Sequence, residues 1–364
     1  MFVMSLYPQT SKQLSILFFI CFALVTFTYL YSESSGTNTL EQFQFYRFSY
    51  TYQHKLAQAD DKNQMQILLL TYMRSGSTLL GDVLSKIENS YYFYEPFRLI
   101  QQYLNASQIS SSDELFKKIT DDWTAKLFNC NLNQTIFNVT FTQNITTKFS
   151  RFLTEGMLSH SGISNPWIDQ FNRNDTIVLN EEQKCKKSNF LILKTIRVSN
   201  LERTWKVMRN FKNMKIIHLL RDPRARQNSQ KKLGFYQNST KVCKNCANNL
   251  EIARKLTNED NKFAINYFEF IYEKLAVDSI SYMENMVSNF LKISISEELK
   301  NFIANITTAS TSTQNEKLPS FLATSRNIST ISSKWRVQLS AELRNETENN
   351  PLCQKIMDLV GYEN

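Results

Sequence analysis

Five short apolar or aromatic runs indicate strands in this chain. The first is Ile-Leu-Leu-Leu at 67–70, and the others lie at 91–94, 190–196, 214–220 and 263–270. A parallel strand that is covered on both faces is almost continuously hydrophobic. The runs therefore predict buried strands, and the polar residues after the first four mark where those strands end.

Apolar residues at helical spacing follow the first strand and recur between the later ones. They stand at positions 79, 80, 83, 84 and 87, and further helices are expected at 201–211, 247–256, 280–291, 297–306 and 352–360, the last ended by Gly361. Strands alternating with helices predict an α/β fold, with a central parallel sheet flanked by helices. Residues 99–182 read as an irregular insertion with some helices, among them 147–158, and residues 307–333 as a polar loop.

The N-terminal part of the chain carries an uncharged apolar stretch. It covers 18 residues, 14–31, which is just long enough for a helix to cross a bilayer. Lys12 precedes it and Glu33 follows it, so the positive-inside rule places the short tail in the cytosol. A cleaved signal peptide is the alternative, although no A-x-A-like cleavage site follows the stretch. We expect a cytosolic tail at 1–13, a transmembrane signal-anchor at 14–31, a stem at 32–63 and a lumenal domain at 64–364.

Glycosylation signals and cysteines agree with that topology. The chain holds nine N-x-[ST] sequons, which are used in lumenal or secreted proteins. They lie at Asn105, Asn133, Asn138, Asn144, Asn174, Asn238, Asn305, Asn327 and Asn345. A lumen also permits disulfides, with at least one cysteine left over from Cys130, Cys185, Cys243, Cys246 and Cys353. Because no second C-x-x-C exists, a structural bridge suits Cys243-x-x-Cys246 better than a redox or zinc site.

The charge balance favours anionic ligands. Lys and Arg number 42 against 33 Asp and Glu, which gives a net charge of +9. The basic residues are spread along the chain without a dense run, and this argues against nucleic acid as the partner.

Residues 74–78, Arg-Ser-Gly-Ser-Thr, form a turn between the first strand and the first helix. Such a turn points unpaired backbone N–H groups and a helix dipole at the space in front of it, which suits phosphate or sulfate. Gly76 allows close approach, three hydroxyls add donors, and Arg74 adds a positive charge. A P-loop kinase would have Lys after the last Gly, where this chain has Ser77. A plain connecting turn is the alternative.

A second cluster follows the strand at 214–220. Arg221 ends that strand, Pro223 suits the first turn of a helix, and Ser229 lies about two helical turns beyond Arg221. The arginines at 221, 224 and 226 predict an anion site, because guanidinium groups match phosphate oxygens. A solvated basic helix start is the alternative. Two anion sites at the ends of parallel strands suit a ligand with phosphates at both ends.

The two clusters together resemble the signature of sulfotransferases. More narrowly, they resemble the Golgi carbohydrate 6-O-sulfotransferases, which modify galactose, N-acetylgalactosamine or N-acetylglucosamine. The similarity continues in Tyr94-Glu95-Pro96, Leu193-Lys194 with Arg197, Tyr272-Glu273-Lys274-Leu275, Thr324-Ser325-Arg326-Asn327 with Trp335, Cys353 and Leu359-Val360-Gly361-Tyr362. These landmarks run in family order from about residue 65 to 362, and the long middle insertion is not covered.

The resemblance implies a P-loop-like sulfotransferase fold and 3′-phosphoadenylyl sulfate (PAPS) as the donor, with no metal. It implies that the 5′-phosphosulfate binds at 74–79 and the 3′-phosphate at Arg221 and Ser229, with help from Arg326. The residues expected to bind the donor are Met73, Arg74, Ser75, Gly76, Ser77, Thr78, Leu79, Arg221, Asp222, Pro223, Arg224, Arg226, Ser229 and Arg326.

Two residues are candidates for the chemistry. Sulfuryl transfer needs a base for the attacking hydroxyl and charge stabilisation at the leaving oxygen. Glu95 is the candidate base, because it follows a strand near the first anion loop. A carboxylate that merely pairs with Arg98 or Arg74 is the alternative. Since Pro96 follows it, Glu95 is expected to have extended backbone geometry.

Lys194 resembles the lysine that cytosolic sulfotransferases place beside the bridging oxygen. Their catalytic histidine would stand two residues later, where this chain has Ile196. Because that histidine is missing, Glu95 is favoured as the catalytic base. His218 sits in mid-strand and is expected to be a core histidine.

The predicted reaction transfers a sulfuryl group from PAPS to a sugar hydroxyl, the 6-hydroxyl of Gal, GalNAc or GlcNAc, in glycoprotein or proteoglycan glycans. A heparan-type or protein-tyrosine sulfotransferase would share the donor site and differ in the acceptor. A nucleotide kinase would need magnesium and a P-loop lysine, and a non-catalytic glycan-binding module would not need two phosphate sites. The resemblance implies a single-pass Golgi membrane protein with a glycan partner. Neither the acceptor sugar nor the oligomeric state follows from the sequence.

Overall fold

The structure, a computed structural model, describes residues 64–98, 100–101, 113–132, 182–308 and 327–362. The expected tail, anchor and stem, the helix at 147–158 and Arg326 lie outside these ranges. Within them, no helix is both long and apolar enough to cross a membrane.

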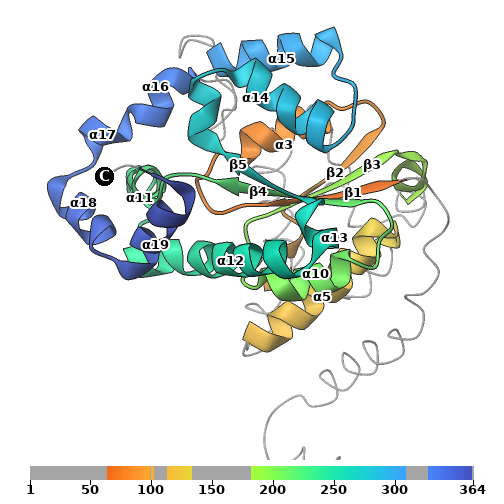
Figure 1. Cartoon of the computed structure of the whole chain (residues 1–364), viewed down its shortest axis with the longest axis horizontal. Helices are drawn as coiled ribbons and strands as arrows, with labels where there is room; N and C mark the ends of the chain where they lie inside the picture. Colours follow the sequence, from red (N-terminus) through yellow and green to blue (C-terminus); the bar gives the residue numbers. More distant parts are fainter. Residues whose placement is uncertain (1–63, 99, 102–112, 133–181, 309–326, 363–364) are drawn as a thin grey trace, which may run out of the picture. The chain divides into compact units, whose positions relative to one another are not determined.

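The predicted strands form one five-stranded sheet (Figure 1). They are β1 (Met65–Leu70), β2 (Ser90–Tyr94), β3 (Phe190–Thr195), β4 (Met214–Leu220) and β5 (Tyr267–Ile271). The order across the sheet is β2-β3-β1-β4-β5, and every neighbouring pair is parallel. The central strand β1 is buried along its whole length, as its continuous apolar run predicts.

Helices cover both faces of the sheet (Figure 1). One face carries α3 (Ser77–Ser85), α14 (Ser279–Glu284), the π-helical turn η2 (Asn285–Phe290) and α15 (Glu297–Thr308). Their apolar residues and those of β1 and β4 belong to one core cluster. The other face carries α5 (Asp113–Phe128), α10 (Leu201–Met208), α12 (Ser239–Glu259) and α13 (Asn261–Ala264). The expected α/β layering is therefore confirmed.

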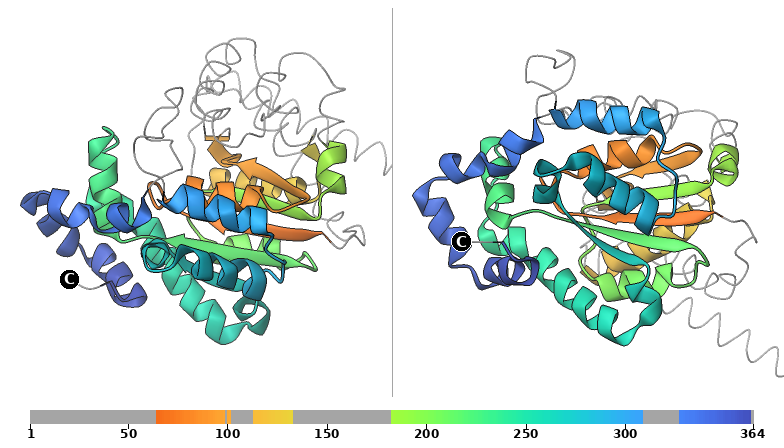
Figure 2. Two further views of the ribbon diagram at one scale, coloured as in Figure 1. Left: turned by 90° about the horizontal axis from the view of Figure 1, so that it is seen from above. Right: turned by 45° about the horizontal axis from the view of Figure 1, so that its top comes forward.

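Four short helices gather at one end of the sheet (Figure 2). They are α16 (Ile328–Ser333), α17 (Trp335–Gln338), α18 (Ala341–Glu348) and α19 (Pro351–Val360), and the last three contact α11 (Pro223–Lys232). Helix α19 ends at Gly361, whose φ of 81° is the left-handed C-cap that the sequence predicts.

Local capping explains where the elements differ from expectation. The strand expected at 263–270 begins only at Tyr267, because Asp260 accepts a hydrogen bond from the Phe263 N–H and starts the short helix α13. The region expected to be a polar loop contains α16, because Asn327 caps its first turn. Helix α12 starts earlier than the apolar pattern indicates, since Asn238 caps it at residue 239.

Candidate active site

The parallel register brings the predicted site residues to one edge of the sheet. Glu95 follows β2, Lys194 lies at the end of β3, the loop with Arg74 follows β1, and Arg221 follows β4. Tyr272 directly follows β5. Ligands of open α/β sheets bind outside the carboxyl ends of the strands, so this edge is the candidate active site.

The first motif builds an open helix N-terminus. Gly76 caps α3 with a φ of 93° and without a side-chain hydrogen bond. The first bond into the helix runs from Leu80 N to Gly76 O, so the N–H groups of residues 77–79 precede it. The hydroxyls of Ser77 and Thr78 make no hydrogen bond to another described residue. Donors at this turn therefore face the space in front of the helix.

The Ser75 hydroxyl has a different position from its neighbours. It is fully buried, donates to Tyr72 O at 2.7 Å and lies 2.5 Å from the Thr71 hydroxyl. It therefore stabilises the turn from within.

The two motifs contact each other directly. Arg74 Nε donates to Ser229 Oγ at 3.0 Å, and Arg221 donates to the Arg74 carbonyl at 3.0 Å. Arg226 Nε donates to the carbonyl of Met73 at 3.3 Å. The helix that carries the second motif therefore holds the loop that carries the first. Arg74 has a φ of 65°, a left-handed conformation that a side chain enters at a cost of about 1–2 kcal/mol.

Tyr272 contacts both candidate anion-binding motifs. A Cβ added at Gly76 would lie 2.3 Å from Cε2 of the Tyr272 ring, so the ring packs directly on the glycine. The Arg221 guanidinium lies 4.4 Å from the centroid of the same ring. Gly76 is therefore needed both for its backbone conformation and for the ring, which in turn supports Arg221.

The three arginines of the second motif have different surroundings. Arg224 is buried over Trp335 and pairs with Asp222 at 2.9 Å and with Glu348 at 3.0 Å. Arg226 is buried over the Tyr72 ring. Arg221 is 8% exposed, and its Nε has no hydrogen-bond partner in the part of the chain that the structure describes. Arg226 Nη1 also lacks a partner among the described residues, but Arg226 is only 2% exposed, so Arg221 is the more exposed of the two arginines that keep an unpartnered donor.

Asp222 and Pro223 start the helix as the sequence predicts. The Asp222 carboxylate accepts from Arg224 N at 2.8 Å, and Pro223 is the first residue of α11. The Asp222 N–H donates to Glu273 Oε1 at 3.1 Å, while Tyr362 donates to Glu273 Oε2 at 3.1 Å. Burial raises the pKa of this glutamate. The C-terminal Tyr362 thus supports the start of α11 through Glu273.

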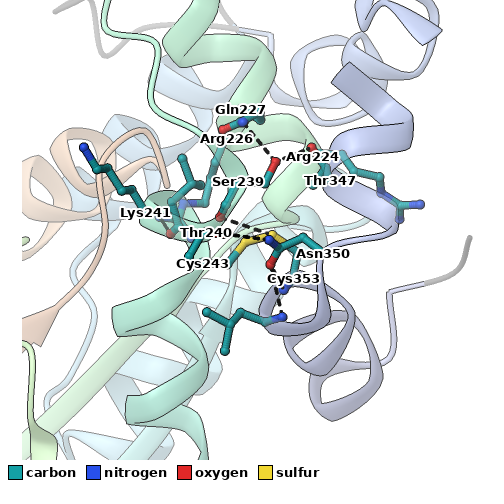
Figure 3. Close-up of a disulfide and its surroundings, with 12 residues drawn as sticks. Arg224, Arg226, Gln227, Ser239, Thr240, Lys241, Cys243, Thr347, Asn350 and Cys353 are labelled. Carbon is teal, nitrogen blue, oxygen red and sulfur yellow. Dashed lines mark hydrogen bonds between the residues drawn. A yellow bond between two sulfur atoms is a disulfide. The ribbon is translucent and has the colours of Figure 1, made fainter. Parts of the chain in front are cut away.

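A disulfide braces the same region (Figure 3). Cys243 in α12 is bonded to Cys353 in α19, and a second bridge joins Cys130 to Cys185. Cys246 is buried without a disulfide, and burial raises its pKa to about 11. The expectation of structural bridges with one cysteine left over is confirmed, and Cys243 and Cys246 do not pair with each other.

Glu95 lies between two cations. Its Oε1 is 2.6 Å from Lys194 Nζ and its Oε2 is 2.5 Å from an Arg197 nitrogen. The sequence suggested Arg98 or Arg74 as the partner of Glu95, and these two ion pairs are with other residues. The expected extended geometry is wrong, because Glu95 has a φ of 50°. A hydrogen bond from its N–H to Lys194 O at 2.9 Å and the two ion pairs hold this conformation.

His218 is a core histidine, as expected. It is fully buried in β4, with Nε2 2.7 Å from the Tyr72 hydroxyl and Nδ1 2.7 Å from the Tyr267 hydroxyl. Burial lowers its pKa to about 3, so the ring is neutral.

A small polar cavity lies beside Arg197. It is lined by residues of α5, of the connection between β3 and α10, and by Phe97, which follows Glu95 by two positions. Arg203 in its wall pairs with Asp121 and with Glu114. Among the described residues, no cluster of His, Cys, Asp and Glu is suited to holding a metal ion.

Sequence reasoning missed two residues as parts of the site. Arg197 and Tyr272 appeared only within the motifs of the resemblance, without a role. Periodicity carries no signal for either, because their contacts are to residues that follow other strands.

Comparison with known proteins settles the family. Residues 66–297 match the model of the sulfotransferase family. The chain belongs to the sulfotransferase family. Carbohydrate sulfotransferase 5 of Mus musculus is 24% identical over 336 residues, 82% of this chain and 81% of the relative. Carbohydrate sulfotransferase 6 of Homo sapiens is 23% identical over 339 residues, 84% of this chain and 82% of the relative. The resemblance seen in the motifs is therefore confirmed.

A solved structure shares the family name. The sulfotransferase domain of the Synechococcus PCC 7002 olefin synthase is 19% identical and aligns with a TM-score of 0.47 over 85% of this chain and 98% of that domain.

Proposed function

We propose that this sulfotransferase moves a sulfuryl group from PAPS to a sugar hydroxyl of a glycan. The observation that supports this most strongly is the meeting of the two anion elements, Arg74 with Ser229 and Arg221 with the Arg74 carbonyl, beside the Lys194–Glu95 pair. The names of the relatives support a carbohydrate acceptor.

The donor would lie along the edge of the sheet from β1 to β4. The N–H groups at the start of α3, the hydroxyls of Ser77 and Thr78, and Arg74 would bind the 5′-phosphosulfate. Arg221, through its unpartnered Nε, and Ser229 would bind the 3′-phosphate. Arg224 and Arg226 would position this site, since their guanidinium groups contact carboxylates or backbone carbonyls. Arg326 remains a proposed contributor.

The chemical step would occur on the β3 side of the first loop. PAPS supplies an activated sulfuryl group, whose bond to the phosphate oxygen breaks as the bond to the acceptor oxygen forms. Glu95 would take the proton of the acceptor hydroxyl. Lys194 would stabilise the negative charge that the leaving phosphate gains. Arg197 would keep Glu95 in place when Lys194 turns toward the donor.

The acceptor would approach from the side of β2 and β3, where the cavity beside Arg197 lies. We propose the 6-hydroxyl of Gal, GalNAc or GlcNAc as the target, with a heparan-type or protein-tyrosine acceptor as the alternative. We also propose residence in the Golgi membrane through a signal-anchor at 14–31, with the domain after the stem in the lumen.

The test is a transfer assay on the purified full-length chain with labelled PAPS and a panel of glycans, without added metal. We expect transfer to at least one glycan, and loss of both transfer and PAP binding in Arg74→Ala and Arg221→Ala. Lys206→Ala is the matched control, because Lys206 is 69% exposed in α10. Absence of transfer across the panel, or activity that survives either arginine substitution, would contradict the proposal.

A further inference from the structure

Asn249 in α12 is a fully buried amide that contacts two separate parts of the active site. Its Nδ2 donates to Val198 O at 2.9 Å and to the Tyr72 hydroxyl at 3.2 Å. Its Oδ1 accepts from Leu201 N at 2.9 Å. Val198 directly follows Arg197, the partner of Glu95, whereas Tyr72 lies two residues before Arg74.

These contacts fix the direction of every hydrogen bond in a buried chain. Because Leu201 N–H can only donate, Oδ1 of Asn249 must be the acceptor, and Nδ2 is the donor to the Tyr72 oxygen. At the other end of the chain of hydrogen bonds, Tyr267 donates its only hydroxyl proton to Glu269, so its oxygen must accept from Nδ1 of His218, and Nε2 of the neutral ring then accepts from the Tyr72 O–H. Neutral His218 carries its proton on Nδ1 and donates it to the Tyr267 oxygen.

The hydrogen-bond chain ends at the charged Glu269 carboxylate. The Tyr267 hydroxyl donates to Glu269 Oε1 at 3.1 Å, and Glu269 pairs with Arg254. Every link from Asn249 to Glu269 therefore has one donor and one acceptor, so reversing any one of them would leave a buried group unpaired.

The Asn249 end of this hydrogen-bond chain supports the loop at residues 74–78, the donor loop. The Tyr72 carbonyl accepts from Ser75 N at 3.2 Å and from Ser75 Oγ at 2.7 Å, and the Tyr72 ring packs against Arg226. A shift of the Tyr72 side chain would therefore move the turn that places Arg74 and Gly76.

We infer that Asn249 is a positioning residue that sets the distance between the donor loop and the Lys194–Arg197 segment, by bonding to Tyr72 on one side and to Val198 and Leu201 on the other. The inference rests on the proposed function for its effect on turnover, and on the contacts alone for its effect on the loop. It differs from general core packing because one amide joins the two segments that must meet across the reacting group.

The test compares Asn249→Ala and Tyr72→Phe with the control Asn248→Ala in the full-length chain. Asn248 lies on the same helix and donates to Ser199 O at 3.0 Å, but it is exposed and does not bond to Tyr72. We expect kcat to fall about 10- to 100-fold in both test variants, because small misplacements cost that much. The donor KM should stay within about threefold, since the phosphate-binding groups remain on the loop.

A second readout does not depend on turnover. Amide hydrogen exchange at residues 73–80 should become faster in Asn249→Ala and in Tyr72→Phe, and stay unchanged in Asn248→Ala. The double variant Tyr72→Phe/Asn249→Ala should lose less kcat than the product of the two single losses, since both substitutions remove the same Tyr72–Asn249 bond. If Asn249→Ala does not fold, Tyr72→Phe decides.

Unchanged exchange at 73–80 in the test variants, or a kcat equal to that of Asn248→Ala, would overturn the inference. If the unmodified protein transfers no sulfate, the proposed function fails, and the exchange measurement still decides the role of Asn249.

Discussion

Gly76→Ala tests whether the donor loop depends on the Tyr272 ring. The substitution adds one methyl group at a residue with a φ of 93°. That methyl carbon would lie 2.3 Å from Cε2 and 2.4 Å from Cδ2 of Tyr272. The ring cannot move freely, because the Arg221 guanidinium lies 4.4 Å from its centroid. The change therefore combines backbone strain with a clash.

The two costs can be separated. A left-handed conformation costs an alanine about 1–2 kcal/mol. Forcing an extra methyl into a packed site costs about 1–3 kcal/mol more. We therefore expect Gly76→Ala to lower the free energy of unfolding by about 2–5 kcal/mol. Displacement of Tyr272 should also weaken PAP binding about tenfold or more, which corresponds to about 1.4 kcal/mol or more.

Gly234→Ala is the matched control. Gly234 has a φ of 71°, and a Cβ there would meet no heavy atom within 4 Å. Both substitutions share the backbone strain and the loss of unfolded-state entropy, so their difference isolates the contact with Tyr272. Urea unfolding measures the stability of each variant, and calorimetry measures its affinity for PAP.

Equal losses of stability in the two variants would refute the reasoning about the ring. PAP affinity unchanged in Gly76→Ala would refute the placement of the donor at this loop.

Three further predictions concern stability. Burial holds the pKa of His218 at about 3 against 6.5 when unfolded, so between these values the unfolded chain binds a proton that the native protein does not. The free energy of unfolding should therefore fall by up to about 1.4 kcal/mol per unit as the pH drops through that window, and His218→Gln should flatten this slope in urea titrations. Arg224→Met leaves the buried Asp222 carboxylate without its partner and should cost about 3–5 kcal/mol in urea unfolding, and a loss below about 1 kcal/mol would contradict the structural role of this arginine. Cys353→Ser opens a bridge between residues 110 positions apart and should cost about 2–5 kcal/mol by the same assay. Cys246→Ser, which breaks no bridge, should cost about 1 kcal/mol or less, so equal losses in the two serine variants would count against the assigned pairing.

Much of the fold was predictable because it depends on local pattern. The apolar runs at 67–70 and 214–220 identify buried strands, and the end of α19 at Gly361 follows from the freedom of glycine at positive φ. The starts of α13 and α16 were missed because single capping side chains, Asp260 and Asn327, set them without an apolar period.

The candidate site was predictable in its parts and not in its contacts. The Arg-Ser-Gly-Ser-Thr turn and the cluster after Arg221 are visible because each is a local strand-to-helix junction. Their contact joins residues 147 positions apart, Arg221 and Arg74, and depends on β4 pairing beside β1. The different surroundings of Arg221, Arg224 and Arg226 were likewise not visible, since three nearby arginines look alike until their partners are known.

The sequence by itself determined the α/β class, the two candidate anion-binding junctions and the candidate pair Glu95 and Lys194, because each follows from local periodicity, turn chemistry or motif. Only the tertiary structure decided that Lys194 and Arg197 share the Glu95 carboxylate and that Tyr272 packs on Gly76. The physical reason is that these contacts depend on strand order, which long-range packing selects and local pattern does not encode.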